Sequence, residues 1–281
     1  TEKVKLLVLF RYKIIIEEVF FVAFIECKFK SKYTGGETDI IVILPVANGK
    51  ELFSGKEIYD FEGKFKTLYL FHGLEDDQSS WIRYTNVEHY AKNKNIALVI
   101  PRVETSFYTD MAYGHQYFTF VSEELPKFVR AIFPLSDKRE DNFVAGMSMG
   151  GYGALKLALS KPKEFSAVAS FSGSPDMIHE LENQQIETNA DILFHDFGRP
   201  EDARNSENDL LYILKNLKER NEDIPKIYQF CGDRDFLYKN NQMFKKYADS
   251  LGVDVEYEEC VGGHEWRLWN LWIKKFIDII G

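Results

Sequence analysis

The chain has 281 residues, of which 45% are hydrophobic and 28% are charged. This composition is typical of a globular protein and excludes disordered, collagen-like and low-complexity chains. The formal net charge is −9, from 35 basic and 44 acidic residues. Nucleic acid and anionic membranes bind clustered lysine and arginine, so this balance argues against either partner. The length fits one large α/β domain or two small ones, and a homo-oligomer is compatible with it.

The three cysteines, Cys27, Cys231 and Cys260, are widely spaced and form no C-x-x-C pair. An odd number without this spacing excludes a disulfide framework and a zinc site of the C-x-x-C type. Free cysteines are typical of a reducing compartment, so we expect a cytoplasmic protein.

The first 21 residues differ from the rest of the chain. Charged residues interrupt their apolar stretches, so none approaches the ~18 residues of a transmembrane helix, and Leu6–Phe10 is shorter than a secretory signal core. One interpretation is a β-rich or disordered leader. Another is that the segment is not coding sequence, because codons for Glu17–Val19 can contain a ribosome-binding sequence and Val22 can be a GTG start. We therefore predict an extra leader over residues 1–21 and one domain over residues 22–281.

Strands are predicted first at Val22–Lys28 and Asp39–Leu44, which Gly35 and Gly36 separate as in a hairpin. Continuous apolar runs then predict strands buried on both faces: Lys66–Phe71, Ile96–Ile100, Asn142–Gly146, Ala167–Phe171 and Ile227–Cys231. Helical segments lie between and after them: Thr85–Lys94, Tyr117–Phe133, Met149–Ser160, Leu210–Arg220, Asn240–Leu251 and Glu265–Ile280. This alternation predicts an α/β fold, with a mostly parallel central sheet and helices on both faces.

The last helical segment carries large apolar residues at steps of three or four: Trp266, Trp269, Trp272, Phe276 and Ile279. Such spacing places them in one stripe along a helix. We expect the stripe to pack on the sheet as part of the core and not to form a ligand cage.

A G-x-S-x-G pattern, Gly146 to Gly150, stands where a predicted strand ends and a helix begins. A serine exposed at the top of a sheet needs a very tight turn, and the residues two before and two after it must be small because the backbones nearly touch. The N–H of Met149, at the helix N-terminus, can point toward a developing oxyanion. The pattern predicts Ser148 as a nucleophile.

A serine nucleophile needs a histidine base, which follows it along the chain in α/β-hydrolases. Three histidines follow Ser148. His264 comes after two glycines and opens the last helix, where a base over the sheet edge must lie. His179 and His195 fall in a polar insertion and are expected to be solvated.

The acid that orients the base should follow a late strand. The predicted strand Ile227–Cys231 is followed by Asp233 and Asp235. Asp235 is our choice. Asp233 is expected to form a turn or an ion pair.

Four separated motifs carry a family resemblance: GMSMGGYG at 146–153, CGDRDFLY at 231–238, GGHEW at 262–266, and LYLFHG at 68–73 with SSW at 79–81. They resemble the esterase D and tributyrin esterase group of α/β-hydrolases, which is related to acetyl-xylan esterases, feruloyl esterases and S-formylglutathione hydrolases. The similarity begins near Val22 and extends to the C-terminus.

The resemblance implies that Ser148 is the nucleophile, His264 the base and Asp235 the residue that orients it. It also implies an oxyanion hole formed by the backbone N–H groups of Leu74 and Met149.

The same resemblance implies that His72 is structural and places Trp81 in the loop after the oxyanion residue. Tyr108 and Tyr113 follow another strand and should lie near the same sheet edge. We list Trp81, Tyr108 and Tyr113 as candidate substrate contacts. The alternative is that these aromatic residues pack against neighbouring helices.

Other chemistries find little support. The sequence has no G-x-G-x-x-G after a strand, no phosphate-binding G-x-x-x-x-G-K-[ST] and no H-E-x-x-H. Acidic residues at 75–77 are expected to be solvated and not to bind a cation. We therefore expect no metal and no cofactor.

The sequence thus predicts a serine carboxylesterase acting on small esters with acetyl to butyryl groups through an acyl-enzyme. The alternatives are a thioesterase of the S-formylglutathione hydrolase type and a feruloyl or acetyl-xylan esterase. A non-catalytic scaffold is disfavoured because all three triad residues are present. The insertion 172–225 is polar around 183–191, which argues against the amphipathic lid of a lipase.

Overall fold

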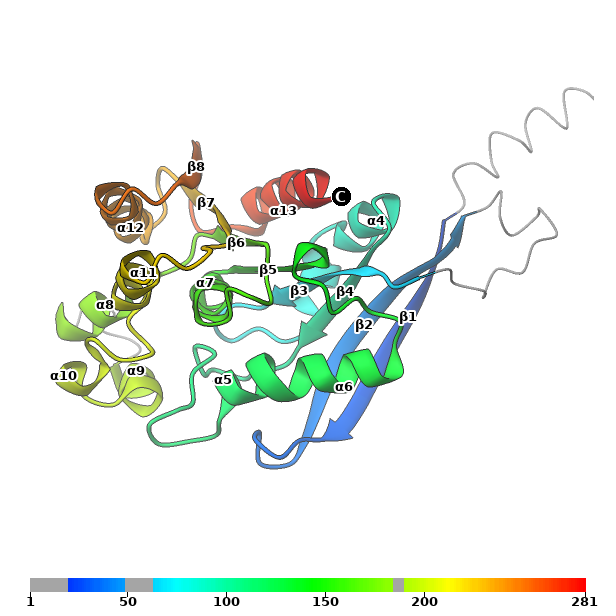
Figure 1. Cartoon of the computed structure of the whole chain (residues 1–281), viewed down its shortest axis with the longest axis horizontal. Coiled ribbons are helices and arrows are strands. Elements are labelled where there is room, and N and C mark those ends of the chain that lie inside the picture. The colour runs from blue at the N-terminus through cyan, green and yellow to red at the C-terminus, as the bar shows by residue number, and fades with distance from the viewer. Residues whose placement is uncertain (1–19, 49–62, 184–189) are drawn as a thin grey trace, which may run out of the picture.

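The computed structural model describes residues 20–48, 63–183 and 190–281. Eight strands form one sheet in the order β1-β2-β4-β3-β5-β6-β7-β8 (Figure 1). Their bounds are β1 Phe20–Lys30, β2 Glu37–Asn48, β3 Lys66–Phe71, β4 Ile96–Pro101, β5 Asn142–Met147, β6 Ala167–Phe171, β7 Lys226–Gly232 and β8 Val255–Cys260. The pairs β1–β2 and β2–β4 are antiparallel, and all other pairs are parallel. The predicted α/β fold with a mostly parallel sheet is confirmed.

Helices cover both faces of this sheet (Figure 1). Helices α3, α4 and α13 pack on one face, and α6, α7, α11 and α12 pack on the other. The bounds are α3 Ser80–Tyr84, α4 Val87–Asn93, α5 Tyr117–Thr119, a π-helical turn Phe120–Glu124, α6 Leu125–Ile132, a 3₁₀ turn Arg139–Asp141, α7 Met149–Ser160, α8 Met177–Asn183, α9 Ala190–Phe197, α10 Pro200–Ala203, α11 Leu210–Glu219, α12 Tyr238–Ser250 and α13 Trp266–Ile280.

The central strands are apolar throughout because both of their faces are covered. In β3, Tyr69 and Phe71 join the core beneath α7, whereas Leu68 and Leu70 join the core beneath α13. All four side chains are fully buried. Successive strand residues point to opposite faces, so a strand between two helical layers cannot alternate apolar with polar residues.

Strand β8 is absent from the sequence prediction. Its sequence is VEYEEC, and it lies at the edge of the sheet beside β7 alone. An edge strand is partly solvated, so it does not carry the continuous apolar run that marks the central strands. Helices α8, α9 and α10, which follow β6, are likewise not predicted.

Two details of the predicted helices are corrected. The segment predicted as one helix over Tyr117–Phe133 contains the π-helical turn Phe120–Glu124. In α13, Ile279 is 44% exposed, whereas Ile280 is 7% exposed. At 100° per residue Ile280 lies near the centre of the apolar stripe, but Ile279 is rotated from it by about 90°.

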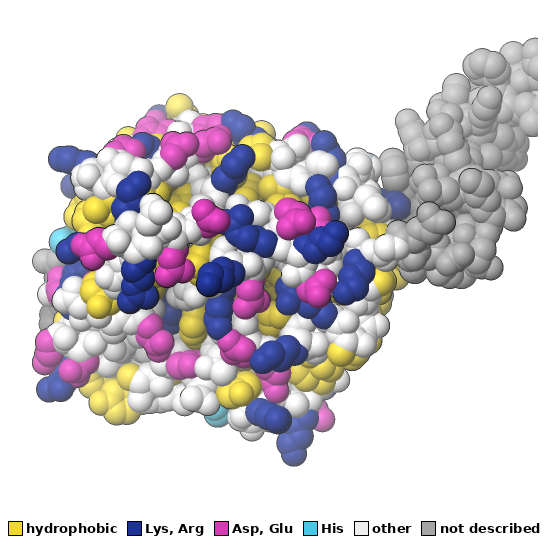
Figure 2. All heavy atoms as spheres, viewed as in Figure 1, with side chains coloured by type: hydrophobic (Ala, Val, Ile, Leu, Met, Phe, Trp, Pro, Cys, Tyr) yellow, Lys and Arg dark blue, Asp and Glu magenta, His cyan; other side chains and the backbone are white. Residues whose placement is uncertain are grey.

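The predicted leader at residues 1–21 falls outside the described residues except for Phe20 and Phe21, which begin β1. Residues 184–189 of the polar insertion also lie outside. Among the described helices, none combines the length and apolar character needed to cross a membrane. On the face drawn in Figure 2, basic and acidic side chains are interspersed.

Candidate active site

Ser148 stands between β5 and α7 with φ 55° and ψ −121°. Non-glycine residues rarely adopt positive φ, so this turn holds strained backbone. Ser148 is half-buried, and its N–H donates to the carbonyl of Phe171 at the end of β6 (2.9 Å). The geometry is that of a strand–turn–helix elbow, which presents a serine side chain at the carboxyl edge of a parallel sheet.

Glycines at both ends of the elbow are required by close backbone contacts. A Cβ on Gly146 would lie 2.2 Å from the carbonyl oxygen of Gly150, and a Cβ on Gly150 would lie 2.5 Å from that of Phe71. No side chain fits at these distances. The first turn of α7 therefore contacts the backbone of β5 at Gly146 and the end of β3 at Phe71.

His264 and Asp235 are brought together from loops that are 29 residues apart in the chain. Nδ1 of His264 lies 2.9 Å from Oδ2 and 3.1 Å from Oδ1 of Asp235. The N–H of Leu237 also donates to Oδ1 (2.9 Å). The Asp235 side chain is fully buried, whereas the His264 side chain is 20% exposed. A neutral imidazole that donates from Nδ1 leaves Nε2 free to accept a proton.

Burial alone would raise the pKa of Asp235, but the hydrogen bond and charge of His264 outweigh it. The pKa of this carboxyl therefore lies below its ordinary value. Asp233 has different partners: its Oδ1 accepts the N–H of Gly262 (3.1 Å) and lies 4.0 Å from the guanidinium of Arg234. Of the two candidate acids, the structure pairs Asp235 with the histidine.

In the described part of the chain, no hydrogen bond joins the Ser148 hydroxyl to the His264 ring within 3.5 Å. Bonds between nucleophile and base are often long in unliganded enzymes and shorten in the complex. Both residues stand at the carboxyl edge of the sheet, because Ser148 follows β5, His264 follows β8, and the strands from β5 to β8 are parallel.

The loop after β3 places Leu74 beside the elbow. The space that a Cβ on Gly73 would need is filled by the side chain of Met147 at the end of β5. Met149 is the first residue of α7, so its N–H has no intrahelical acceptor, and it lies at the positive end of the helix dipole. The loop that carries Leu74 and the N-terminus of α7 therefore lie against each other, where an oxyanion hole is expected.

His72 fixes this loop and is fully buried. Its Nδ1 donates to the carbonyl of Gly73 (2.8 Å), and its Nε2 accepts the N–H of Val103 after β4 (3.1 Å). Burial lowers the pKa of His72 to about 4, so the ring is neutral. The ring joins the ends of two strands, as a structural residue does.

Two of the three aromatic residues expected to contact substrate are core residues. Trp81 is 0% exposed and donates its indole N–H to the carbonyl of Phe71 (2.9 Å). Tyr108 is also 0% exposed, stacks on the Phe71 ring and donates its hydroxyl to the carbonyl of His72 (3.0 Å). Both side chains are fully buried and bond the backbone at the end of β3, so this structure does not support substrate contact through Trp81 or Tyr108.

Tyr113 is 60% exposed and stacks on Phe194 of α9 with ring centroids 5.3 Å apart. Its ring lies on the protein surface, and its contact with substrate stays a prediction. His195 is exposed on the same helix, and His179 lies in α8. Neither is brought to Asp235.

The sequence does not identify two residues that lie beside the proposed base His264 and its acid Asp235. Phe236 is 71% exposed, and its ring lies 4.6 Å from that of His264. Ser172 follows β6 and contacts the acid and α13 from within the core. Neither has a local sequence signal: Ser172 reaches Asp235 only because the sheet order places β6 beside β7.

The acidic loop 75–77 has partners of its own. Asp76 Oδ1 accepts the hydroxyl of Ser80 (2.9 Å), and Asp77 Oδ1 accepts the N–H and hydroxyl of Ser79 (2.7 and 2.6 Å). These bonds form the turn that leads into α3.

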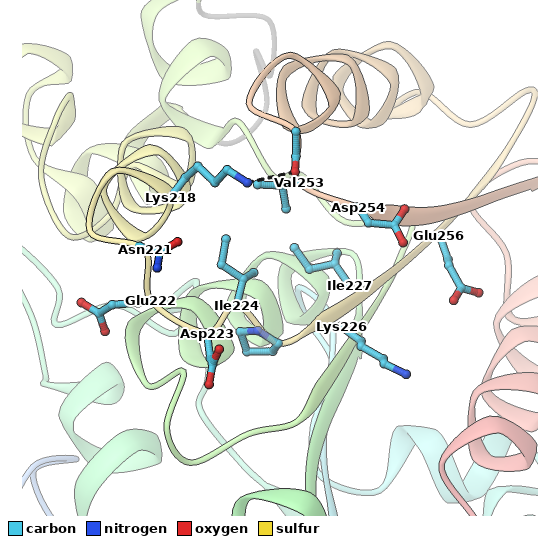
Figure 3. Close-up of a pocket in the computed structure, with 12 residues that line it drawn as sticks. Lys218, Asn221, Glu222, Asp223, Ile224, Lys226, Ile227, Val253, Asp254 and Glu256 are labelled. Carbon is cyan, nitrogen blue, oxygen red and sulfur yellow. Dashed lines mark hydrogen bonds between the residues drawn. The ribbon is translucent and has the colours of Figure 1, made fainter.

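A cavity of about 410 Å³ lies at the opposite edge of the sheet, around the amino ends of β7 and β8 (Figure 3). Charged residues dominate its lining, and the Lys218 ammonium donates to the carbonyl of Gly252 (3.2 Å). Ligands of open parallel sheets bind beyond the carboxyl ends of the strands. This cavity is therefore not the candidate active site.

A family model described as "Putative esterase" matches residues 31–281 of the chain. An acetyl esterase of Caldicellulosiruptor saccharolyticus is 34% identical over 262 residues, covering 91% of this chain and 97% of the relative.

Solved structures agree. The fluorophosphonate-binding serine hydrolase F of Staphylococcus aureus, determined with bound substrate, is 33% identical with a TM-score of 0.82 and covers 92% of this chain and 98% of its own. The S-formylglutathione hydrolase of the same species is 33% identical with a TM-score of 0.80, covering 92% of this chain and 99% of its own. A ferulic acid esterase at 20% identity and a TM-score of 0.75, covering 94% and 98%, shares the fold. The chain therefore belongs to this esterase family and is a carboxylic ester hydrolase of the α/β class.

Proposed function

We propose that the protein is a serine carboxylesterase that hydrolyses short acyl esters through Ser148, His264 and Asp235. The observation that carries this proposal is the buried Asp235 carboxylate on Nδ1 of His264, at the same sheet edge as the strained Ser148 elbow. Free cysteines at 27, 231 and 260 fit the proposed cytoplasmic, reducing environment.

The proposed reaction has two halves. The Ser148 oxygen attacks the ester carbonyl while Nε2 of His264 takes the hydroxyl proton, and the tetrahedral oxyanion is stabilised by the N–H groups of Leu74 and Met149. The intermediate collapses, and the alcohol leaves with the proton from His264. Water then attacks the acyl carbonyl while His264 takes its proton; the bond to the Ser148 oxygen breaks, and His264 returns the proton to Ser148 as the acid is released.

The space behind the elbow supports a short acyl group. The N–H of Phe107 lies 3.3 Å from the sulfur of Met149, which follows the nucleophile. Phe107 packs against Tyr152 and Phe197 with ring centroids 5.5 to 6.1 Å apart. All three rings are buried, with exposures of 6%, 0% and 4%. In the proposed complex this ring cluster closes the acyl site behind Met149, which limits it to a short acyl group.

A fluorophosphonate probe tests the proposal. We expect stoichiometric labelling of Ser148, with loss of p-nitrophenyl acetate hydrolysis, and no labelling of the Ser148→Ala protein. Ser174→Ala is the control, since Ser174 is a buried serine whose hydroxyl has no hydrogen-bond partner among the described residues. Undiminished hydrolysis by Ser148→Ala would reject the proposal.

A thioesterase of the S-formylglutathione hydrolase type is the second candidate, favoured by the 33% identity to such an enzyme over 92% of the chain. The same triad serves both reactions, and only the leaving group differs. Side-by-side kcat/KM values for p-nitrophenyl acetate and S-formylglutathione separate them. A panel of acetylated oligosaccharides, glycerides and feruloyl esters would then identify the alcohol.

A further inference from the structure

Strand β6 lies between the strand that ends in the nucleophile and the strand that leads to the acid. Its last residue, Phe171, accepts the N–H of Ser148 (2.9 Å), and the next residue, Ser172, donates its N–H to the carbonyl of Phe230 in β7 (2.7 Å). Two consecutive residues therefore connect the nucleophile elbow to the acid strand. Ser172 is fully buried and has φ 48°, a left-handed conformation that serine seldom adopts.

The Ser172 hydroxyl faces the groups that hold the base. It accepts the indole N–H of Trp269 from α13 (3.1 Å), and the Trp269 ring stands edge-on against the His264 ring with centroids 4.9 Å apart. Its neighbours on the β7 side are the Asp235 carboxylate and the Cys231 thiol: burial acts to raise the pKa of both groups, and the Ser172 hydroxyl acts to lower it.

A hydroxyl has one proton to donate, and the Trp269 N–H occupies a lone pair, so the Ser172 proton remains available. Of these two neighbours, the thiol is neutral because burial raises the pKa of Cys231. The carboxylate is ionised because the pKa of Asp235 lies below its ordinary value. A charged acceptor makes the stronger hydrogen bond. Of the two acceptors, Asp235 is therefore the preferred one for the Ser172 proton.

We propose that Ser172 is a positioning residue for the triad: accepting from Trp269 and donating to Asp235, it fixes the carboxylate opposite His264. This inference rests on the proposed function, since it assigns Ser172 to the orientation of the proposed base. The chain Trp269–Ser172–Asp235–His264 joins α13, β6 and the acid loop into one unit.

The test compares Ser172→Ala with Ser170→Ala in p-nitrophenyl acetate hydrolysis between pH 5 and 9. Ser170 is also fully buried, two residues earlier in β6, and its hydroxyl has no hydrogen-bond partner in the described part of the molecule. For Ser172→Ala we expect kcat to fall about tenfold with little change in KM, because a hydrogen bond to a charged group is lost.

The pH profile distinguishes positioning from a merely structural role. Without the Ser172 proton the Asp235 charge is less compensated and favours protonated His264 more strongly, so the acid limb of kcat/KM should move up by about half a pH unit. Ser172→Gly should show the same shift and the same loss of kcat. Glycine adopts positive φ without strain, which offsets part of the cost of leaving the buried Trp269 N–H without its acceptor, so Ser172→Gly should be more stable than Ser172→Ala. Ser170→Ala should leave the limb in place.

Three outcomes decide the matter. An unmoved acid limb in Ser172→Gly with parental kcat overturns the inference even if Ser148→Ala is inactive. A loss of rate without a shift of the limb assigns Ser172 to structure alone and also overturns it. Undiminished hydrolysis by Ser148→Ala, measured alongside, would reject the proposed function itself and is thereby distinguished from failure of the Ser172 inference.

Discussion

Asp233 and Asp235 are two residues apart after β7, yet their carboxylates have different hydrogen-bond partners. That of Asp235 is buried on the His264 ring, and that of Asp233 accepts the Gly262 N–H at the surface side of the loop. In the sequence both follow the same strand, so only the turn geometry separates them.

We expect Asp235→Asn to lower kcat for p-nitrophenyl acetate by about a thousandfold or more, because an amide does not hold the imidazole in the required tautomer or stabilise its protonated form. Asp233→Asn is the matched control. It should change kcat by less than about threefold, because a substitution at an exposed position usually changes a free energy by no more than about 0.5 kcal/mol. If Asp233→Asn were the more damaging substitution, the choice of acid would be wrong.

His72 offers a residue-scale test by pH. Its ring is buried and neutral, with a pKa of about 4 against 6.5 in an unfolded chain. Folding therefore favours the neutral form, and the stability this contributes is complete above pH 6.5 and is lost as the pH falls toward 4. The full difference corresponds to about 3 kcal/mol.

In His72→Gln the amide oxygen can still accept the Val103 N–H, but the group no longer titrates. We expect the parent protein to lose more unfolding free energy between pH 7 and pH 4.5 than this variant does, as measured by urea denaturation. His195→Gln, at an exposed position of α9, should keep the parental pH dependence. Equal pH dependence in His72→Gln and the parent would show that His72 does not carry the effect.

At the scale of elements, the elbow depends on two backbones in contact. A Cβ on Gly150 would meet the carbonyl oxygens of Phe71 and His72 at 2.5 and 2.6 Å, and backbone cannot rotate away as a flexible side chain can. The helix that carries Met149 would have to move from the oxyanion loop.

Gly150→Ala should therefore lower both the free energy of unfolding, by about 2–4 kcal/mol, and kcat/KM. Gly36→Ala is the control: a Cβ at this hairpin glycine meets nothing within 4 Å. Its stability should stay within about 0.5 kcal/mol of the parent. Parental stability and activity in Gly150→Ala would show that the elbow can relax.

The elements that the sequence predicts best are those whose local pattern and tertiary role agree. Strands β3 and β6 and helix α7 have the predicted bounds, because burial on both faces or an elbow leaves an unmistakable apolar or glycine pattern. Strand β8 lies at the edge, where glutamates replace the apolar run.

At the candidate site the same division holds. The elbow around Ser148 and the pairing of Asp235 with His264 could be predicted, because a serine elbow requires glycines two residues to either side and the order of the three residues along the chain matches the family resemblance. Trp81, Tyr108 and Ser172 could not be placed, since what they contact depends on which strands become neighbours. An aromatic residue near a motif looks the same in sequence whether it faces the pocket or the core.

On the scale of the whole molecule, the described parts of the segment between β6 and β7, residues 172–183 and 190–225, are held against the domain. Asn240 of α12 bonds the N–H of Asp176 (3.0 Å) and the carboxylate of Glu180 in α8 (2.7 Å). Arg204 pairs with Asp176 and also with Asp209, the residue before α11. A lipase lid needs a large apolar face that turns outward, whereas Met177 and Leu193 on α8 and α9 are buried in the core.

This anchoring, together with the packed rings of Phe107, Tyr152 and Phe197, predicts substrate size. For p-nitrophenyl esters of two to sixteen carbons, we expect the highest kcat/KM at two to four carbons, because in the proposed complex the packed aromatic rings limit the length of the acyl chain. The rate on tributyrin should rise smoothly with concentration and show no jump where droplets form, since interfacial activation requires a lid that opens onto lipid. A lipase with a mobile lid, assayed in parallel, provides the positive control for such a jump. An optimum at eight carbons or beyond would mean that the aromatic cluster opens around the acyl chain, and would overturn the assignment to short esters.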